Sequence, residues 1–410
     1  MDIKSLKLGK MKLEGFVKRP DAERDRIKIT AIGLGQAGGK MAQEMARLGY
    51  FTLLINTAQS DLDDITEVSN EQKVVLPGFG GASKDIARGQ KAVEQNIKMV
   101  AAALKRKEVL EADFVWVFAG LGGGTGNGGM PTILEGLYNL RKGKQYKPGQ
   151  PTIGVVAAIP GEWEKSGLKE NAVAGVAKLK LAIDHKKVGS VLIVDNNKLY
   201  NDYYANENNV NRYMEWEVYG NTTVASMLFE IAVTTSLPAS TSLDVSELID
   251  IWSTPGFLAM GKKEFYNEIT DNSELIKIIH DSYKRSGVFA DEYNFERDSL
   301  VGGFIAVAPR NKFITSGTLV KVEEAVNKVL EIARITHPGL IENDIWETTH
   351  DRVSKEKCII YTMAVIATLP KRIQVLVKNI QEAQRRAAEA KKQRESEGSI
   401  DLSMFTGMYE

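Results

Sequence analysis

Short apolar runs alternate with helix-like stretches along the first half of the chain. The runs lie between turn or helix signals at 27–32, 51–57, 74–76, 113–119, 152–159 and 190–195. Short apolar runs separated by helical stretches are typical of parallel strands buried on both faces. The pattern predicts an α/β fold with a doubly wound parallel sheet. Such sheets bind ligands in the loops beyond the carboxyl ends of their strands.

The second half predicts a different organisation. Apolar positions with helical spacing predict a long central helix that Pro238 ends: Val224, Met227, Leu228, Ile231 and Thr235. Strand-like runs at 302–309 and 358–370 and helical stretches at 273–285 and 318–334 then predict a smaller α+β domain. We predict five parts: an N-terminal extension (1–26), the domain of the parallel sheet with its candidate ligand loops (27–221), the central helix (222–240), the second domain (241–373), and an extended C-terminal helix with a tail (374–410).

Composition and charge exclude several classes of function. Lys plus Arg and Asp plus Glu number 53 each in 410 residues, so the net charge gives no footprint for direct DNA or membrane binding. The lone Cys358 and four scattered histidines show no metal-ligand spacing, so we predict no protein-held metal. No apolar run approaches the ~18 residues of a membrane span, and none is typical of a signal peptide. We expect a cytoplasmic protein.

Candidate chemistry begins with the stretch AGLGGGTGNGGM at 119–130. A strand that ends in such a loop and leads into a helix offers unblocked N–H groups and a helix N-terminus, and both suit phosphate oxygens. Glycine lets a ligand approach the backbone to hydrogen-bond distance. The alternative is a tight structural loop or a flexible linker. Its position between an apolar strand and a helix favours phosphate binding.

The common phosphate motifs fit poorly. Residues 33–38 match G-x-G-x-x-G, but a dinucleotide site also needs an acidic residue about 20 positions on, where this strand ends in Asn56 and Thr57. The Walker pattern is absent, because Gly39 and Lys40 precede a methionine. A Rossmann-type dinucleotide enzyme therefore stays an alternative only.

The sequence G-G-G-T-G-N-G at 122–128 resembles the signature loop of the tubulin/FtsZ superfamily of filament-forming GTPases. Further stretches resemble the family's motifs in the family's order: 35–38, 55–62, 78–89, 160–164 and 194–199. The resemblance covers about residues 27–373 and, at 253–265 and 367–373, is greatest to the TubZ branch. It implies these nucleotide-binding residues: Gly35, Gln36, Ala37, Gly81, Ala82, Ser83, Gly122, Gly123, Gly124, Thr125, Gly126, Asn127, Glu164, Asn196 and Asn221. Asn127 departs from the family, which has a small residue there.

The acidic pair Asp244 and Glu247 has the spacing of the family's catalytic loop. The resemblance implies that this loop completes the nucleotide site of the next subunit and orients the attacking water, which ties hydrolysis to assembly. Alternatively, Ser242 or Asp244 is simply the N-cap of a surface helix. A nucleotide-binding scaffold that polymerises without turnover also stays open.

The resemblance thus implies a GTPase that uses GTP and Mg²⁺ and polymerises head to tail into polar filaments. The TubZ branch implies segregation or positioning of plasmid or phage DNA through a DNA-binding adaptor protein, with no membrane partner. An FtsZ-like division protein is the second candidate, although the long linker typical of FtsZ is missing.

Overall fold

A computed structural model describes residues 27–205, 215–235, 239–241, 243–265, 272–284, 295–308, 335–342 and 358–397. The predicted N-terminal extension, the helical stretch at 318–334, Pro238, Ser242 and the C-terminal tail lie outside these residues.

The predicted parallel sheet is present in the first half. Six strands run parallel in the spatial order β3 (Lys73–Val75), β2 (Phe51–Asn56), β1 (Ile29–Leu34), β4 (Phe114–Gly120), β5 (Ile153–Ile159) and β6 (Ser190–Asp195). This order reverses direction at β1, so the carboxyl ends of β1 and β4 flank a topological switch point. Open sheets of this kind bind ligands at such a point.

Strand β4 shows why these runs are apolar throughout. Val115 and Val117 point into one core, whereas Phe114, Trp116 and Phe118 point into the other. Successive side chains of a strand face opposite sides of the sheet, so a strand covered on both sides has no polar face.

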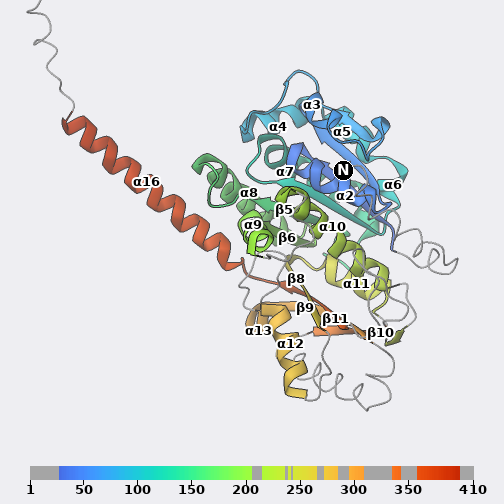
Figure 1. The fold of residues 1–410 in the computed structure, drawn as a ribbon. Coiled ribbons are helices and arrows are strands. Elements are labelled where there is room, and N and C mark those ends of the chain that lie inside the picture. The colour runs from blue at the N-terminus through green and yellow to red at the C-terminus, as the bar shows by residue number, and fades with distance from the viewer. Residues whose placement is uncertain are drawn as a thin grey trace, which may run out of the picture.

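Helices cover both faces of the sheet (Figure 1). On one face lie α2 (Gly35–Arg47), α3 (Gln59–Asp63), α9 (Asn196–Ala205), α10 (Trp216–Thr234) and α11 (Val245–Ser253). On the other lie α4 (Ile86–Gln95), α5 (Ile97–Leu104), α6 (Lys107–Leu110), α7 (Gly124–Leu140), α8 (Ser166–Asp184) and α12 (Asn272–Lys284). Three further helices are short: the 3₁₀ helices η2 (Asn70–Gln72) and η3 (Lys142–Lys144), and α13 (Phe295–Asp298) in the second half of the chain.

The second half continues the same sheet. Beyond β6 come β8 (Gly256–Phe265), β11 (Cys358–Ile366), β9 (Ser299–Ala308), β10 (Ile335–Glu342) and β7 (Ala239–Thr241). The β6–β8 pairing is parallel but spans only two residue pairs, and β11 is antiparallel to both of its neighbours. The described strands thus form one eleven-stranded sheet with a narrow join between its two halves. From this body α16 (Lys371–Glu397) extends away (Figure 1).

Two helical boundaries differ from the sequence prediction. The central helix α10 begins at Trp216 and ends at Thr234. Each end therefore lies about six residues before the predicted one, at 222 and 240. The sequence of residues 85–106 likewise predicts one long helix, whereas the structure divides it at Asn96, whose side-chain amide donates to the carbonyl oxygens of Pro77 and Ala92. That contact with a distant turn interrupts a helical pattern that continues in the sequence.

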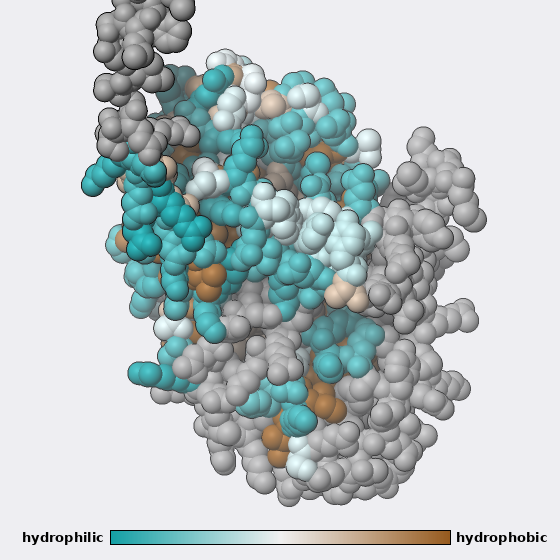
Figure 2. Space-filling model, turned by 60° about the vertical axis from the view of Figure 1, so that its left-hand side comes forward, coloured by the Kyte–Doolittle hydropathy of each residue, from teal (hydrophilic) through white to brown (hydrophobic). Residues whose placement is uncertain are grey.

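The surface of the described part is mainly polar. In the view of Figure 2, hydrophilic side chains cover most of it and apolar ones form small, separate patches. No helix among the described residues is both long and apolar enough to span a membrane.

Candidate nucleotide site

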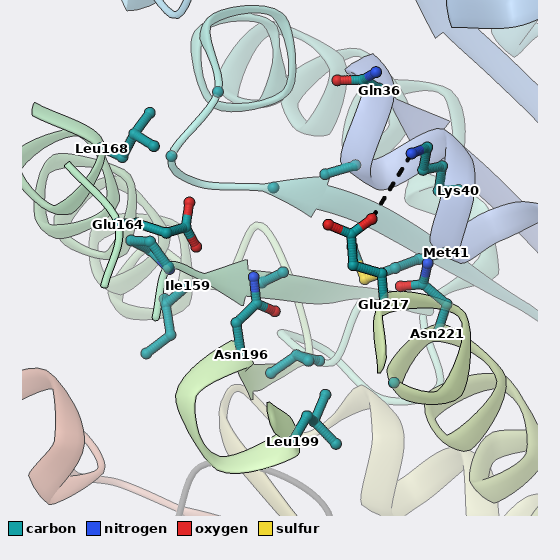
Figure 3. A pocket seen from close by; sticks show the side chains of 18 of the residues that line it. Gln36, Lys40, Met41, Ile159, Glu164, Leu168, Asn196, Leu199, Glu217 and Asn221 are labelled. Carbon is teal, nitrogen blue, oxygen red and sulfur yellow. Dashed lines mark ion pairs between the residues drawn. The ribbon is translucent and has the colours of Figure 1, made fainter. Parts of the chain in front are cut away.

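A cavity of about 460 Å³ lies at the carboxyl ends of the central strands. Its walls come from the loops after β1, β4, β5 and β6 and from the first turns of α10 (Figure 3). The structure brings seven of the predicted nucleotide-binding residues together in its lining: Gln36, Ala37, Gly122, Gly123, Glu164, Asn196 and Asn221.

Two helices begin at this cavity without a cap. α2 begins at Gly35 and α7 at Gly124. Neither has a side-chain hydrogen bond at its N-cap, nor an acidic residue in its first turn. The first N–H groups of a helix have no partner within the helix, and the helix dipole favours an anion there. Two uncapped N-termini at one cavity make a strong anion site.

The glycines of the signature loop have two different roles. Gly122 and Gly123 line the cavity, and a Cβ on Gly123 would meet only the Gly120 carbonyl oxygen, at 3.5 Å. A Cβ on Gly124 would lie 2.6 Å from the Asp85 carbonyl oxygen, and one on Gly126 would lie 2.9 Å from that of Leu34. The later glycines are therefore needed because other backbone segments pack against them.

The loop between β3 and α4 is held in an unusual conformation. Ser83 and Lys84 have φ angles of 50° and 65°, a region that residues other than glycine rarely adopt. The side-chain amide of Asn171 donates to the carbonyl oxygens of Lys84 (2.8 Å) and Gly122 (3.0 Å) and so joins this loop to the signature loop. Lys84 reaches the cavity, although the sequence analysis did not select it.

The other predicted residues are not part of this lining: Gly35, Gly81, Ala82, Ser83, Gly124, Thr125, Gly126 and Asn127. Thr125 Oγ1 is hydrogen bonded to Thr57 Oγ1 at 2.7 Å. Asn127 is fully buried, and its amide donates to the carbonyl oxygens of Leu121 and Asn171, both at 2.6 Å. In this structure the two side chains brace the loop.

The side of the cavity away from Gln36 is lined by polar groups of mixed character (Figure 3). Asn196 begins α9, and Asn221 lies one turn after Glu217 on α10. The Glu217 carboxylate is 3.9 Å from the Lys40 ammonium, and both side chains are about half exposed. Glu164 caps its own turn, because its Oε1 accepts the Gly161 N–H at 2.9 Å.

Two family models match most of this chain. One, described as the GTPase domain of the tubulin/FtsZ family, matches residues 28–204. The other, the C-terminal domain of TubZ-like tubulin/FtsZ-like proteins, matches residues 230–377. The chain belongs to the tubulin/FtsZ family.

TubZ proteins are among its relatives. Tubulin-like protein TubZ of Bacillus cereus is 30% identical over 260 residues, but the match spans only 57% of that relative and 60% of this chain. TubZ of Bacillus thuringiensis subsp. israelensis is 25% identical over 93% of this chain and 82% of its own length. A crystal structure of a GTPγS-form protofilament of TubZ from serovar israelensis superposes with a TM-score of 0.75 at 21% identity, covering 96% of this chain and all of that one. This likeness shows the tubulin/FtsZ fold.

The acidic pair of this tubulin/FtsZ-family chain lies outside the cavity lining. Asp244 caps α11. Its Oδ1 accepts the Glu247 N–H at 2.8 Å, and Glu247 Oε2 accepts the Asp244 N–H at 3.0 Å. This reciprocal capping box is the N-cap arrangement considered as the alternative. Asp244 is exposed and Glu247 is half-buried, so the box also presents carboxylate oxygens to solvent.

Aromatic rings at the cavity mouth were missed by the sequence analysis. Trp163 and Trp216 line the cavity, their ring centroids are 5.6 Å apart, and Tyr200 packs against both. Trp163 remains 50% exposed. The three residues come from separate elements of the tubulin/FtsZ fold, so no local motif could have indicated the cluster.

Proposed function

We propose that the protein binds GTP, hydrolyses it and assembles head to tail into polar filaments. The observation that carries the proposal is the pair of uncapped helix N-termini, α2 and α7, at one cavity that also has glycine backbone in its wall. A triphosphate is the ligand that such a cradle suits best. Membership of the tubulin/FtsZ family, with its GTPase domain, supports this assignment.

The polar side of the cavity supports guanine over adenine. Glu217 offers a carboxylate, and Asn196 and Asn221 offer amide donors and acceptors. Guanine presents two adjacent donors, N1–H and the N2 amine, and a carboxylate can accept both, whereas adenine presents an acceptor at N1. A site that hydrogen bonds one ligand discriminates strongly against an analogue that leaves its groups unpaired.

Mg²⁺ would enter with the triphosphate. The described residues contain no cluster of three His, Cys, Asp or Glu side chains that could hold an ion. Mg²⁺ typically keeps several waters and binds through substrate phosphates and one or two carboxylates. The ion would neutralise phosphate charge as it develops during hydrolysis.

The position of the acidic pair supports a site shared between subunits. Asp244 is exposed and Glu247 half-buried at the start of α11, and neither lines the cavity of its own chain. They can therefore act on a nucleotide only in a second copy. A contact between a cavity on one end and an acidic loop on the other is heterologous, and it propagates a filament when it does not close. Structural neighbours described as TubZ protofilaments and as a two-stranded TubZ filament support such assembly.

The cellular role follows from the TubZ relatives. One structural neighbour is described as the type III plasmid segregation protein TubZ. We propose that this chain also segregates or positions plasmid or phage DNA in the cytoplasm. Because its charges balance, a separate DNA-binding adaptor would provide the link to DNA.

The first test is right-angle light scattering with parallel phosphate release after addition of GTP, GDP, ATP or buffer. We expect scattering to rise with GTP alone and to fall as phosphate accumulates. Flat scattering with every nucleotide would overturn assembly, and a tight complex with NAD instead would favour a dinucleotide enzyme.

Substitutions that keep the helix cap test the acidic pair. Asn is as good an N-cap as Asp, and Gln fits the capping box as well as Glu. Asp244→Asn and Glu247→Gln should therefore fold normally, assemble with GTP and lose hydrolysis. Parental hydrolysis in both variants would show that the pair only caps α11.

A further inference from the structure

The root of the C-terminal helix is fixed to the nucleotide-binding half by one buried guanidinium. Arg372 is the second residue of α16, and its side chain is 10% exposed. Its Nε donates to Asp195 Oδ2 at 3.1 Å, and its Nη1 donates to Glu162 Oε1 at 3.4 Å. The Asp195 side chain is itself 6% exposed, so this contact is largely shielded from solvent.

Both acidic partners are next in sequence to residues that line the cavity. Asp195 is the last residue of β6 and directly precedes Asn196, which lines the cavity. Glu162 directly precedes Trp163, which also lines it. The Arg372 side chain therefore contacts two separate segments that adjoin the cavity wall.

The two wall segments are also joined to each other. Asp195 Oδ1 accepts the Asn197 N–H at 3.0 Å, and Asn197 Oδ1 accepts the Glu162 N–H at 3.3 Å. Burial raises the pKa of the Asp195 carboxyl, and Arg372 opposes that rise. Without the guanidinium, this buried carboxylate would lose the cation that compensates its desolvation, and the network would have to rearrange.

The described contacts between α16 and the body lie in the first half of the helix. Ile373, Leu376 and Ile380 are buried against the body, and Gln384 donates to Glu170 of α8 at 3.4 Å. Every residue from 383 to 393 is exposed. The helix rises about 1.5 Å per residue. A tilt at Arg372 would therefore be amplified along the part that extends from the body in Figure 1.

We propose that Arg372 is a positioning residue for the nucleotide site, and that through it occupancy of the cavity is coupled to the orientation of α16. The inference rests on the proposed function, because it takes the ligand of the cavity to be a nucleotide. Ligand contacts with Trp163 and Asn196 set the positions of Glu162 and Asp195, and these set the guanidinium at the helix root. Coupling between two sites is reciprocal, so the contact at Arg372 also sets nucleotide affinity.

The test compares three variants with the full-length parent. Arg372→Met removes the guanidinium, Arg372→Lys keeps a charge that can satisfy one partner, and Glu162→Gln keeps size at an exposed position where folding is not at risk. Arg385→Met is the matched control on α16, because Arg385 pairs only with the exposed Glu389 of the same helix among the contacts described. Fluorescent GDP gives the affinity, hydrogen exchange of residues 371–384 gives the coupling, and thermal unfolding gives the stability.

We expect Arg372→Met to bind GDP about tenfold more weakly and to lose the effect of GDP on exchange in α16. Arg372→Lys should recover part of both, Glu162→Gln should lose about twofold, and Arg385→Met should match the parent. If Arg372→Met fails to fold, the GDP affinity and hydrogen exchange of Glu162→Gln and Arg372→Lys test the coupling. The coupling would be overturned if those two variants had the GDP affinity and the hydrogen exchange of the parent. It would also be overturned if GDP did not change the hydrogen exchange of α16 in the parent. A parent that binds no guanine nucleotide would overturn the proposed function and this inference together.

Discussion

Adjacent glycines in the signature loop offer a direct test of the two roles assigned to them. Gly123 has φ −84° and ψ 166°, which alanine adopts without strain. Its Cβ would meet one atom, the Gly120 carbonyl oxygen at 3.5 Å, and would otherwise face the cavity. Gly123→Ala should therefore keep the fold, with a gain of up to about 1 kcal/mol from the reduced entropy of the unfolded chain. It should weaken GTP binding about tenfold or more, since about 1.4 kcal/mol of lost contact suffices.

The next residue should behave in the opposite way. A Cβ on Gly124 would lie 2.6 Å from the Asp85 carbonyl oxygen and 2.8 Å from both the Asp85 nitrogen and the Ala82 Cβ. Two of these atoms are backbone, so the whole loop has to move. Overpacking of this kind costs about 1–3 kcal/mol, which a helix-propensity gain of about 1 kcal/mol offsets only in part. Gly124→Ala should thus lower the free energy of unfolding.

Urea unfolding and equilibrium binding of a fluorescent GTP analogue would measure the two effects in both variants. The expected result is weaker binding at parental stability for Gly123→Ala and reduced stability for Gly124→Ala. Gly123→Ala with parental affinity would refute the placement of the phosphates at this wall. Gly124→Ala with parental stability would refute the close backbone contact.

Two further predictions concern buried polar groups. Burial raises the pKa of Glu44, and Arg47 opposes the rise. A raised folded-state pKa contributes stability that is fully present below the unfolded value and is lost as pH rises through the folded value. Glu44→Gln should therefore gain stability relative to the parent as the pH rises above about 4.3, the ordinary pKa of glutamate, in urea titrations. An identical pH dependence in parent and variant would contradict this assignment. Asn127→Ala should lose about 1–3 kcal/mol of stability in the same assay, because the carbonyl oxygens of Leu121 and Asn171 lose their donor. Weaker GTP binding at unchanged stability would instead indicate direct contact with the ligand.

Local patterns predicted the strands well where both faces are covered. The run at 190–195 is strand β6 to the residue, because every one of its side chains is buried. Strand β8 was missed, since Lys262 and Lys263 interrupt its apolar pattern. Lys262 is nevertheless mostly buried, and its ammonium contacts Glu230 Oε2 of α10 at 2.9 Å. A partner 32 positions away in the sequence compensates the charge, and periodicity cannot register such a contact.

The candidate site also contains residues that local motifs predicted and residues that they could not predict. Motif order placed Gln36, Gly123 and Asn196 in one cavity, because each lies in the loop or first helical turn after a strand whose carboxyl end reaches the same edge of the sheet. Arg372 could not be found in this way. It lies 177 positions after Asp195, and its role depends on how α16 packs against the nucleotide-binding half.

A glycine motif also reports two physical needs that look the same in a sequence. Gly123 leaves room for a ligand, whereas Gly126 leaves room for the Leu34 carbonyl oxygen at the end of β1. If phosphate contact alone required the glycines, those away from the cavity could vary freely. Because β1 and the β3–α4 loop pack against the start of α7, the later glycines set how closely the loops at the cavity approach one another. The motif therefore specifies the geometry of the cavity, and this explains how a short sequence can identify a whole fold.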